Sequence, residues 1–284
     1  MRAFVVLLLG ILAGTARAHP PAAGAAELFV GGLVGPEGIA FTGAGDLLAG
    51  SITGEIRRYA ADGSFTVLAN VGESLAGITV LRDGRVLAAS VGFSRVWSVD
   101  PSGAASVFAT GVAGPNFIVQ LRSGRILVSD SSSGTIVEIT GGSPVVRASG
   151  LTYPNGLAIG PDHFLYVAET FANRVSRLAI GKGGTLGPPE VYATGLSIPD
   201  GIAFDVAGNL LVVGARPSVV DAKTQAVSTL PTGGLLKFSS NLAFGRGHGF
   251  RRKDVYLVDY GAPLGSGTTI VRLPYNHTGA KLIR

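Results

Sequence analysis

The sequence predicts an all-β protein with the architecture of a six-bladed β-propeller, in which each blade holds four antiparallel strands. Two observations support this fold class. A short phrase, made of proline, a variable residue and usually glycine, recurs along the chain, and its spacing of about 40 residues is the length that four short strands and their turns require. The chain between these phrases consists of short runs rich in β-branched residues and leucine, bounded by glycine, aspartate and asparagine, as strands and turns are.

The recurring phrase marks the start of each predicted blade. It is most complete at 35–41 (Gly-Pro-Glu-Gly-Ile-Ala-Phe), 153–159 (Tyr-Pro-Asn-Gly-Leu-Ala-Ile) and 198–204 (Ile-Pro-Asp-Gly-Ile-Ala-Phe), and it is shorter at 114–118 (Gly-Pro-Asn-Phe-Ile). Its variable letter is the marker residue of the blade, and the six markers are Glu37, Ala76, Asn116, Asn155, Asp200 and Ser240. Successive markers are evenly spaced, with a slightly longer gap only between the fourth and the fifth, so the repeat predicts six blades.

Within each period the strands are expected in a fixed order. A short apolar strand follows the marker, and second strands are expected at 46–51, 85–90, 125–130, 164–169, 209–214 and 254–259. Third strands are expected at 54–59, 95–100, 135–140 and 174–180, and fourth strands at 65–69, 106–110, 145–149 and 190–194. The fifth blade is the least regular, because residues 216–234 contain two prolines and alternate only weakly.

The ring is expected to close through its N-terminal strand. The last marker leaves room for three strands that end near Tyr275, whereas residues 27–31 precede the first marker and have no blade of their own. The phrase Leu-Phe-Val-Gly-Gly-Leu at 28–33 also resembles Val-Tyr-Ala-Thr-Gly-Leu at 191–196, in a fourth strand. We therefore predict that 27–31 form the outer strand of blade six and cover an otherwise open edge.

The N-terminal residues predict an exported protein, periplasmic or secreted. Residues 1–18 contain a basic residue, a short apolar run and an Ala-Arg-Ala stop, which is typical of a secretory signal peptide. Residues 19–26 are expected to form a flexible mature N-terminus. The remaining residues, 27–284, are expected to form a single propeller domain.

Composition excludes several classes of function. Loss of the two arginines of the signal lowers the formal net charge from +5 to +3, and the basic residues form no broad stripe, so no nucleic-acid partner is expected. The chain has no cysteine, which excludes disulfides, thiolate metal sites and thiol nucleophiles. No later stretch approaches the roughly 20 apolar residues of a membrane-spanning helix. We expect a monomer that acts on a small molecule.

Four of the six markers carry a carboxylate or a carboxamide. The first strand of every propeller blade lies nearest the axis, so the markers should form a ring around the channel. Without a cation, Glu37 and Asp200 would bring like charges together there, and the amides of Asn116 and Asn155 would add unpaired acceptors. Ligands that are all oxygen favour Ca²⁺, although another divalent cation could be held, and four protein oxygens leave about two places for water or substrate.

A structural interpretation of the same phrases stays open at this point. Pro-Asn-Gly and Pro-Asp-Gly are ordinary turn sequences, which a repeat protein would reuse for backbone conformation alone. Two features of the sequence favour the metal: the marker changes identity while the following glycine usually stays, and Ala76 and Ser240 do not suit the same turn chemistry.

At the marker residues the chain resembles the calcium-dependent six-bladed propellers of the senescence marker protein, gluconolactonase and luciferin-regenerating enzyme family. The resemblance covers roughly residues 27–275. It implies that Glu37, Asn155 and Asp200 hold one axial metal, and that Asn116 is an additional asparagine at the metal or the substrate. It also implies hydrolysis of a lactone or related ester, in which the metal polarises the carbonyl and Asp200 is the catalytic base or nucleophile.

The chain departs from the family pattern at its second site. The family often has Asn-Asp-Gly there, with an arginine two residues before it that binds a sugar acid. Here Phe117 follows Asn116, and Gly114 stands where the arginine would be. We therefore expect the metal site more strongly than we expect a sugar-acid lactone as the substrate.

An alternative family suggests a protein without catalysis. The stretch 154–175, with Pro-Asn-Gly-Leu-Ala-Ile and Leu-Tyr-Val-Ala-Glu-Thr, also resembles an NHL repeat, and NHL propellers usually bind a ligand or a protein partner and need no axial metal. Such repeats usually keep one turn residue from blade to blade, whereas the marker here changes.

The loops between second and third strands should open on the same face as the markers and line the mouth of the channel. Their residues, together with Asn116, are the expected substrate contacts: Phe93, Phe171, Asn173, Arg216 and Tyr260. The phenyl rings could hold an apolar group and the guanidinium an anion. His248, in a turn on the opposite face, is expected to have a solvated or structural role.

Overall fold

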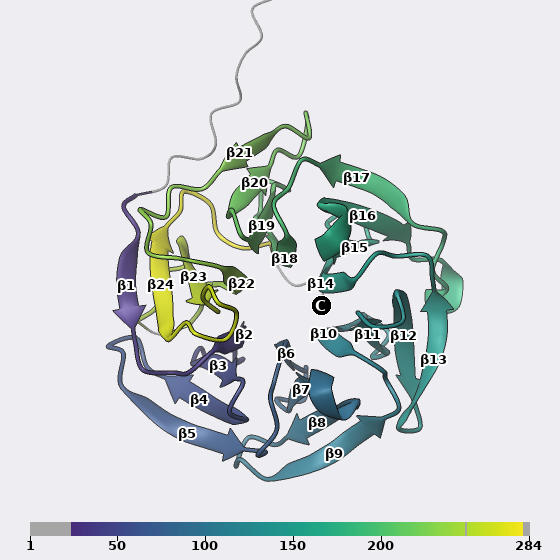
Figure 1. The fold of residues 1–284 in the computed structure, drawn as a ribbon, viewed down its shortest axis with the longest axis horizontal. Coiled ribbons are helices and arrows are strands. Elements are labelled where there is room, and N and C mark those ends of the chain that lie inside the picture. Colours follow the sequence, from purple (N-terminus) through teal and green to yellow (C-terminus); the bar gives the residue numbers. More distant parts are fainter. Residues whose placement is uncertain (1–23, 248, 281–284) are drawn as a thin grey trace, which may run out of the picture.

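The computed structural model describes residues 24–247 and 249–280. It has twenty-four strands in six four-stranded antiparallel sheets arranged around one axis, which confirms the predicted six-bladed propeller (Figure 1). The predicted signal peptide, residues 19–23 of the predicted mature N-terminus, His248 and the tail 281–284 lie outside the described residues. Within the described residues, no helix has the length and apolar character that a membrane crossing requires.

The first three blades follow one another along the chain, each with its first strand next to the axis (Figure 1). Blade one contains β2 (Pro36–Phe41), β3 (Leu47–Ser51), β4 (Glu55–Tyr59) and β5 (Phe65–Asn70). Blade two contains β6 (Ile78–Val80), β7 (Val86–Ser90), β8 (Arg95–Val99) and β9 (Ala105–Thr110). Blade three contains β10 (Pro115–Gln120), β11 (Ile126–Asp130), β12 (Thr135–Thr140) and β13 (Ser143–Ala148).

The remaining blades keep this order. Blade four contains β14 (Pro154–Ile159), β15 (Phe164–Glu169), β16 (Arg174–Ala179) and β17 (Glu190–Thr194). Blade five contains β18 (Pro199–Phe204), β19 (Leu210–Gly214) and the two short strands β20 (Ser218–Val220) and β21 (Val227–Thr229). Blade six contains β22 (Ser239–Phe244), β23 (Asp254–Asp259), β24 (Thr269–Pro274) and β1 (Glu27–Val30).

The N-terminal strand closes the ring, as the sequence predicted. β1 pairs antiparallel with β24, with Glu27 opposite Arg272, so the first and last strands of the chain complete one sheet (Figure 1). Its ring-bearing residue, Phe29, packs against three aromatic rings of blades one and six, at centroid distances of 5.1 Å from Tyr256, 6.0 Å from Phe250 and 6.4 Å from Tyr59.

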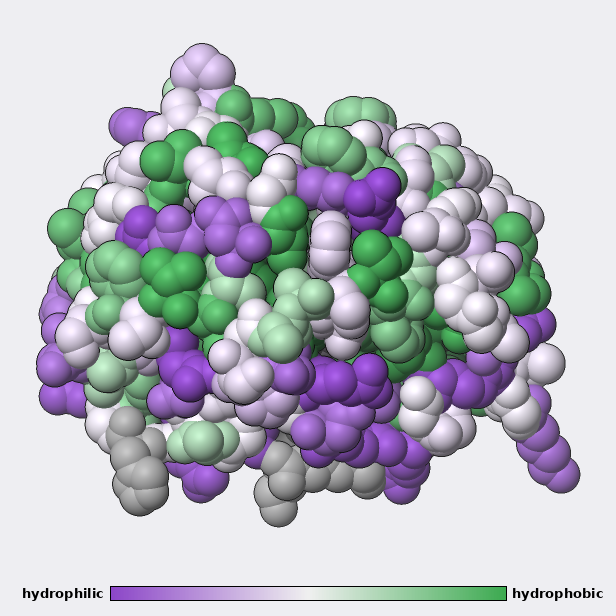
Figure 2. Space-filling model, turned by 90° about the horizontal axis from the view of Figure 1, so that it is seen from below, coloured by the Kyte–Doolittle hydropathy of each residue, from purple (hydrophilic) through white to green (hydrophobic). Residues whose placement is uncertain are grey.

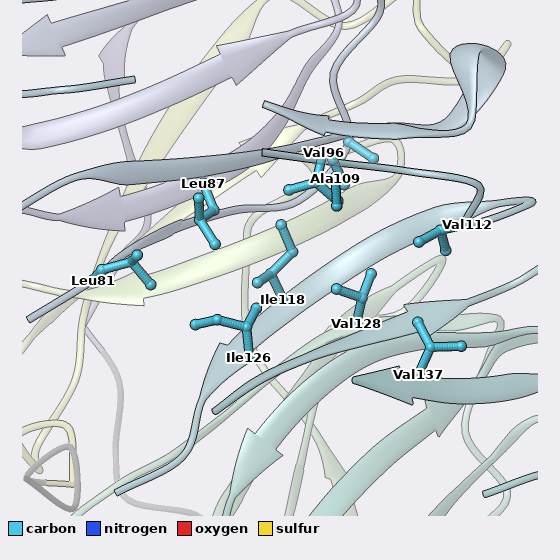
Figure 3. Packing of buried hydrophobic residues seen from close by; sticks show 11 residues of the cluster. Leu81, Leu87, Val96, Ala109, Val112, Ile118, Ile126, Val128 and Val137 are labelled. Carbon is cyan, nitrogen blue, oxygen red and sulfur yellow. The ribbon is translucent and has the colours of Figure 1, made fainter. Parts of the chain in front are cut away.

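The core lies between neighbouring blades. The second strands of blades one to three are buried at every residue, because each sheet packs another sheet on both of its faces, and this explains their unbroken apolar runs. Figure 3 shows the layer between blades two and three, where Leu87 and Val96 of one sheet meet Ile118 and Val128 of the next. Such two-sided packing makes the angle between blades rigid.

The first strands approach one another too closely for a side chain at the position after the marker. A Cβ at Gly38 would lie 2.5 Å from the Ala76 carbonyl oxygen, and one at Gly77 would lie 2.6 Å from the Asn116 carbonyl oxygen. A Cβ at Gly156 would overlap the Asp200 carbonyl oxygen. The recurring glycine therefore permits close approach between blades at the axis.

Each marker with an acidic or amide side chain lies in a β-bulge. The pairing of first and second strands shifts register between Pro36 and Ile39 in blade one. The same shift occurs in blades three, four and five, between Pro115 and Ile118, between Pro154 and Leu157, and between Pro199 and Ile202. Bulges turn a side chain out of the regular alternation and are frequent beside active sites. The pairing also shifts between Ser239 and Asn241 in blade six, around the marker Ser240. The markers therefore lie in bulged strands and not in turns between strands, and the bulge accompanies the phrase whether or not its marker carries a carboxylate or an amide.

The outer wall of the ring carries exposed apolar side chains among polar ones, as the edge-on view in Figure 2 shows. They come from the outermost strands and include Leu28, Phe65, Val67, Val107 and Val191. Each of these strands pairs on one edge only, so its outward face is open to solvent.

The closing strand gives a test of how far stability depends on it. Replacing Phe29 by Ala removes a ring packed against three others, and we expect the free energy of unfolding to fall by about 2 kcal/mol. The neighbouring Leu28 is 61% exposed, so Leu28→Ala should change it by less than about 0.5 kcal/mol. Urea unfolding of both variants measures this difference, and equal effects would contradict a closing role for the aromatic contact.

Candidate functional site

Four markers are each the second residue of the first strand of their blade: Glu37, Asn116, Asn155 and Asp200. Glu37 is half-buried, and the other three side chains are at most 5% exposed. The backbone carbonyl groups of three markers accept hydrogen bonds from the neighbouring blade. Gly77 N donates to the Asn116 carbonyl at 3.0 Å, Ser129 Oγ donates to the Asn155 carbonyl at 2.7 Å, and Ser240 Oγ donates to the Glu37 carbonyl at 3.2 Å. The six blades thus bring the predicted ligand set to one ring.

Hydroxyl groups fix the orientation of the two asparagine amides. Asn116 Nδ2 donates to Ser131 Oγ at 3.2 Å, and Ser131 Oγ donates in turn to the Pro154 carbonyl at 2.7 Å. Asn155 Nδ2 donates likewise to Thr170 Oγ1 at 3.2 Å, and Thr170 Oγ1 donates to the Pro199 carbonyl at 2.8 Å. Because each hydroxyl donates its hydrogen to a carbonyl, it can only accept a hydrogen bond from the asparagine, so the amide group must point its nitrogen toward the hydroxyl.

This arrangement leaves a row of buried acceptors without partners. Asn116 Oδ1, Asn155 Oδ1 and Asp200 Oδ1 are buried and accept no hydrogen bond within the described part of the chain. A buried polar atom without a partner costs about 1–3 kcal/mol. Three such atoms on three adjacent blades would be a large penalty unless a further group satisfies them.

The two carboxylates of the ring interact electrostatically across the axis. Burial raises the pKa of Glu37 from 4.5 to about 7, against a hydrogen bond from Tyr260 that lowers it. Burial also raises the pKa of Asp200 well above its usual range, and the charge of Glu37 adds to this rise. Each acid therefore favours the protonated form in the absence of a positive charge.

Two tyrosines border the ring, and the sequence pointed to only one of them. The hydroxyl of Tyr260, a predicted substrate contact, hydrogen-bonds Glu37, and burial and the charges of Glu37 and Asp200 raise its pKa to about 12. Tyr153 was not predicted; burial and the same two charges raise its pKa. The sequence could have indicated it, because Tyr153 is the one aromatic residue that directly precedes the proline of the recurring phrase.

Carboxylates at the ends of second strands hold the loops that lead into the ring. Asp130 accepts from the backbone N–H groups of Ala113 and Gly114, at 3.2 and 2.9 Å. Glu169 accepts from Thr152 N at 2.7 Å, and it pairs with Arg174 at 2.7 Å. These contacts fix the backbone immediately before Asn116 and Asn155.

The other predicted substrate contacts lie farther out on the mouth. Phe93 and Phe171 are 49% and 68% exposed and lie on the short 3₁₀ helices η1 (Val91–Phe93) and η2 (Thr170–Ala172). Asn173 ends η2, and its Oδ1 accepts from Ile198 N at 2.9 Å, so this side chain positions the loop before Asp200. Arg216 is exposed in the loop between β19 and β20.

The departure at Gly114 has a steric cause. A Cβ at this position would overlap Ser132 Oγ and lie 2.8 Å from Ser132 N, so no side chain fits where the resembling family often has arginine. Phe117 stands where the recurring phrase usually has glycine after the marker. Its side chain is buried and packs with Leu127 and Leu157 between blades three and four.

The chemistry of the donor set fits a hard divalent cation. Within the described residues, no cluster of three or more histidine, cysteine, aspartate or glutamate side chains is placed to hold a metal, so a carboxylate-rich or imidazole site is absent there. The ring instead offers two carboxylates and two amide oxygens, and three of these oxygens lack partners. Carboxylate and amide oxygens together are typical ligands of Ca²⁺.

The fold and the ring define the chain as a six-bladed propeller with a polar site on its axis. A family model described as "Strictosidine synthase-like, N-terminal" matches residues 23–59, which include Glu37. No curated protein sequence matches the chain.

Several solved structures share this fold across nearly the whole chain. A gluconolactonase from Xanthomonas campestris has a TM-score of 0.75 and 21% identity over 92% of this chain and 96% of its own. Luciferin-regenerating enzyme has a TM-score of 0.73 and 14% identity over 90% and 98%. Regucalcin, a calcium-binding protein from Agrobacterium tumefaciens, has a TM-score of 0.70 and 17% identity over 93% and 96%. The resemblance predicted from the markers is thus confirmed at the level of the fold.

The raised pKa values predict how the stability of the chelated protein depends on pH. The folded protein keeps the Glu37 proton up to about pH 7, whereas the unfolded chain loses it near pH 4.5. Deprotonation of Glu37 therefore costs folding free energy, and stability should fall by about 3 kcal/mol as the pH rises through this window.

Urea unfolding at several pH values, with chelator present, measures this slope. Glu37→Gln should reduce the slope to the part that the buried Asp200 contributes, while Glu190→Gln, at an exposed glutamate on β17, should leave it unchanged. A chelated wild type that gains stability between pH 5 and 7 would contradict the electrostatic description of the ring.

Proposed function

We propose that the chain is an exported, monomeric, metal-dependent hydrolase of lactones or related esters, with its metal on the propeller axis. One observation carries the proposal: three buried oxygens of the ring, on three adjacent blades, have no partner within the described residues, while the amide nitrogens beside two of them are held in place by hydroxyls. Export rests on the sequence of residues 1–18.

Calcium is the cation that this ring favours. Glu37 and Asp200 would balance its charge, and Asn116 and Asn155 would supply neutral oxygens. When bound, the cation would polarise the carbonyl oxygen of the substrate. The calcium-binding protein regucalcin has the same fold, which supports the choice of metal.

The remaining chemistry falls to groups of the chain. Asp200 is the general base: one of its oxygens belongs to the ring, and the other takes the proton of the attacking water and delivers it to the leaving oxygen as the C–O bond breaks. Tyr260 holds the Glu37 carboxylate by its hydrogen bond. Ser131 and Thr170 keep the amide oxygens directed into the ring.

The gluconolactonase fold supports a lactone or ester as the substrate. The sugar-acid lactone itself fits this chain less well, because no side chain can stand at Gly114. Asn116, Phe93, Phe171 and Arg216 are the proposed substrate contacts, and the guanidinium would suit an anionic group.

The alternative is a propeller that binds a ligand or protein without catalysis, as the NHL-like phrase suggests. The three unpaired oxygens of the ring count against a binding propeller without a metal, since they favour a bound cation. A non-catalytic propeller that holds a structural cation would keep the same ring, so it is the assay of hydrolysis that distinguishes it from the proposed enzyme.

Calcium should stabilise the folded protein. A ligand bound only by the folded state raises stability by RT ln(1 + [L]/Kd), and at a hundredfold excess over Kd we expect the melting temperature to rise by about 5 °C or more above that of chelated protein. Differential scanning calorimetry measures this shift. Asn155→Asp, which adds a charge to the ring, should still respond, whereas Asp200→Asn should lose most of the response. An unchanged melting temperature in the wild type would refute the axial cation.

The Asp200→Asn variant also tests the proposed reaction. Asp200→Asn should lower kcat/KM for lactones and aryl esters by at least about 100-fold, because it removes both the base and one charge at the axis. Asp62→Asn, in an exposed turn between β4 and β5, is the matched control and should keep full activity. Hydrolysis that survives in Asp200→Asn would place the chemistry elsewhere, and a wild type that hydrolyses neither class would favour the binding propeller.

A further inference from the structure

Two stacked aromatic rings and an exposed isoleucine of the next blade lie close to the markers. This group, the apolar ledge, consists of Tyr153, Phe171 and Ile198. The rings of Tyr153 and Phe171 stack at a centroid distance of 4.4 Å with their planes tilted by 38°. Phe171 is 68% exposed and Ile198 is 42% exposed, so the ledge presents apolar surface to solvent at the mouth.

The residues of the ledge share hydrogen-bond partners with the marker Asn155. Thr170 N donates to the Tyr153 carbonyl at 3.2 Å, and Thr170 Oγ1 joins Asn155 to the Pro199 carbonyl. Ile198 N donates to Asn173 Oδ1 at the end of η2. The ledge therefore spans blades four and five, directly before the markers of both.

Two of the three residues adopt a strained backbone conformation. Tyr153 has φ of 53° and Ile198 has φ of 47°, a left-handed conformation that is costly for a bulky or β-branched residue. Each also precedes proline, which restricts its conformation further. At the equivalent place in blade one the chain has Gly35, with φ of 54°. Blades four and five thus keep large apolar side chains where glycine would be unstrained.

Packing does not account for Phe171 and Ile198, which are exposed, whereas Tyr153 is partly buried. An isoleucine that is nearly half exposed and a phenylalanine that is two-thirds exposed gain little from burial in the protein alone. Strained residues persist where function requires the conformation.

We propose that the apolar ledge binds an alkyl or aryl substituent of the substrate, so that the preferred substrates are apolar lactones or esters and not polyhydroxylated ones. This inference rests on the proposed function for the placement of the reacting carbonyl at the axis. The substituent lies across Phe171 and Ile198, while the carbonyl lies over the ring of markers.

Binding of two hydrolytically stable lactams separates this inference from the reaction. Calorimetric titration of the calcium-loaded protein should show that a γ-lactam with a hexyl chain binds at least about tenfold more tightly than the unsubstituted γ-lactam. Phe171→Ala should reduce this preference to about threefold or less. Phe65→Ala, which removes an exposed ring from the outer strand β5, is the matched control and should keep the full preference.

A second variant tests the role of the strain. Ile198→Gly should also lose the preference for the hexyl lactam, while its melting temperature stays equal to that of the wild type or rises, since glycine adopts φ of 47° without strain. A marked fall in its melting temperature with the preference retained would assign Ile198 to packing.

The outcomes distinguish the two proposals. Tighter binding of the hexyl lactam by a protein that hydrolyses no lactone or ester would refute the reaction and support the ledge. Equal binding of the two lactams by an active hydrolase would overturn the ledge alone. Equal binding together with sedimentation of the protein on phosphatidylcholine vesicles, lost in Phe171→Ala, would also overturn it and assign the surface to a membrane.

Discussion

The close approach of the six first strands at the axis is the constraint on which the rest of the structure depends. Glycine after the marker lets the backbone of one blade reach the carbonyl of the next, as the contact of Gly77 with Asn116 shows. Where blade three has Phe117 instead, Ser129 Oγ bridges to the Asn155 carbonyl at 2.7 Å. The approach is held from outside by apolar layers between the sheets and by β1, which completes the last blade. A ring closed in this way places each marker with little freedom.

The site gains its character from an imbalance of donors and acceptors. Ser131 and Thr170 satisfy the nitrogens of the two amides and the carbonyls of the following blades, and they leave the amide oxygens unsatisfied. Burial raises the pKa of Asp200, and the charge of Glu37 in the same ring raises it further. A divalent cation would remove both penalties at once, whereas protonation relieves only the repulsion. The proposed metal therefore follows from the unpaired oxygens of the ring and from the repulsion between its two acids.

The two ends of the site differ in what they specify. The ring of markers would set the type of reaction, and the loops of the mouth would set which substrate reaches it, as is common where one scaffold serves many activities. Here the loops of blades four and five carry Tyr153 and Ile198 in strained conformations, while Gly114 of blade three carries no side chain. Polarity at the axis and apolar surface above it suit a molecule with a carbonyl at one end and a hydrophobic group at the other.

The sequence by itself determined the number of blades, the order of the strands, the closure by β1 and the identity of the four oxygen-bearing markers. The blade length and strand order repeat along the chain, so they can be read in one dimension, and the closing strand and the variable markers stand out against that period. The tertiary structure alone decided that the markers lie in bulges and not in turns, that Thr170 and Ser131 orient the amides, and that Tyr153 and Ile198 stand beside them. These features depend on hydrogen bonds between blades and on the sign of single backbone angles, which exist only once the ring has closed.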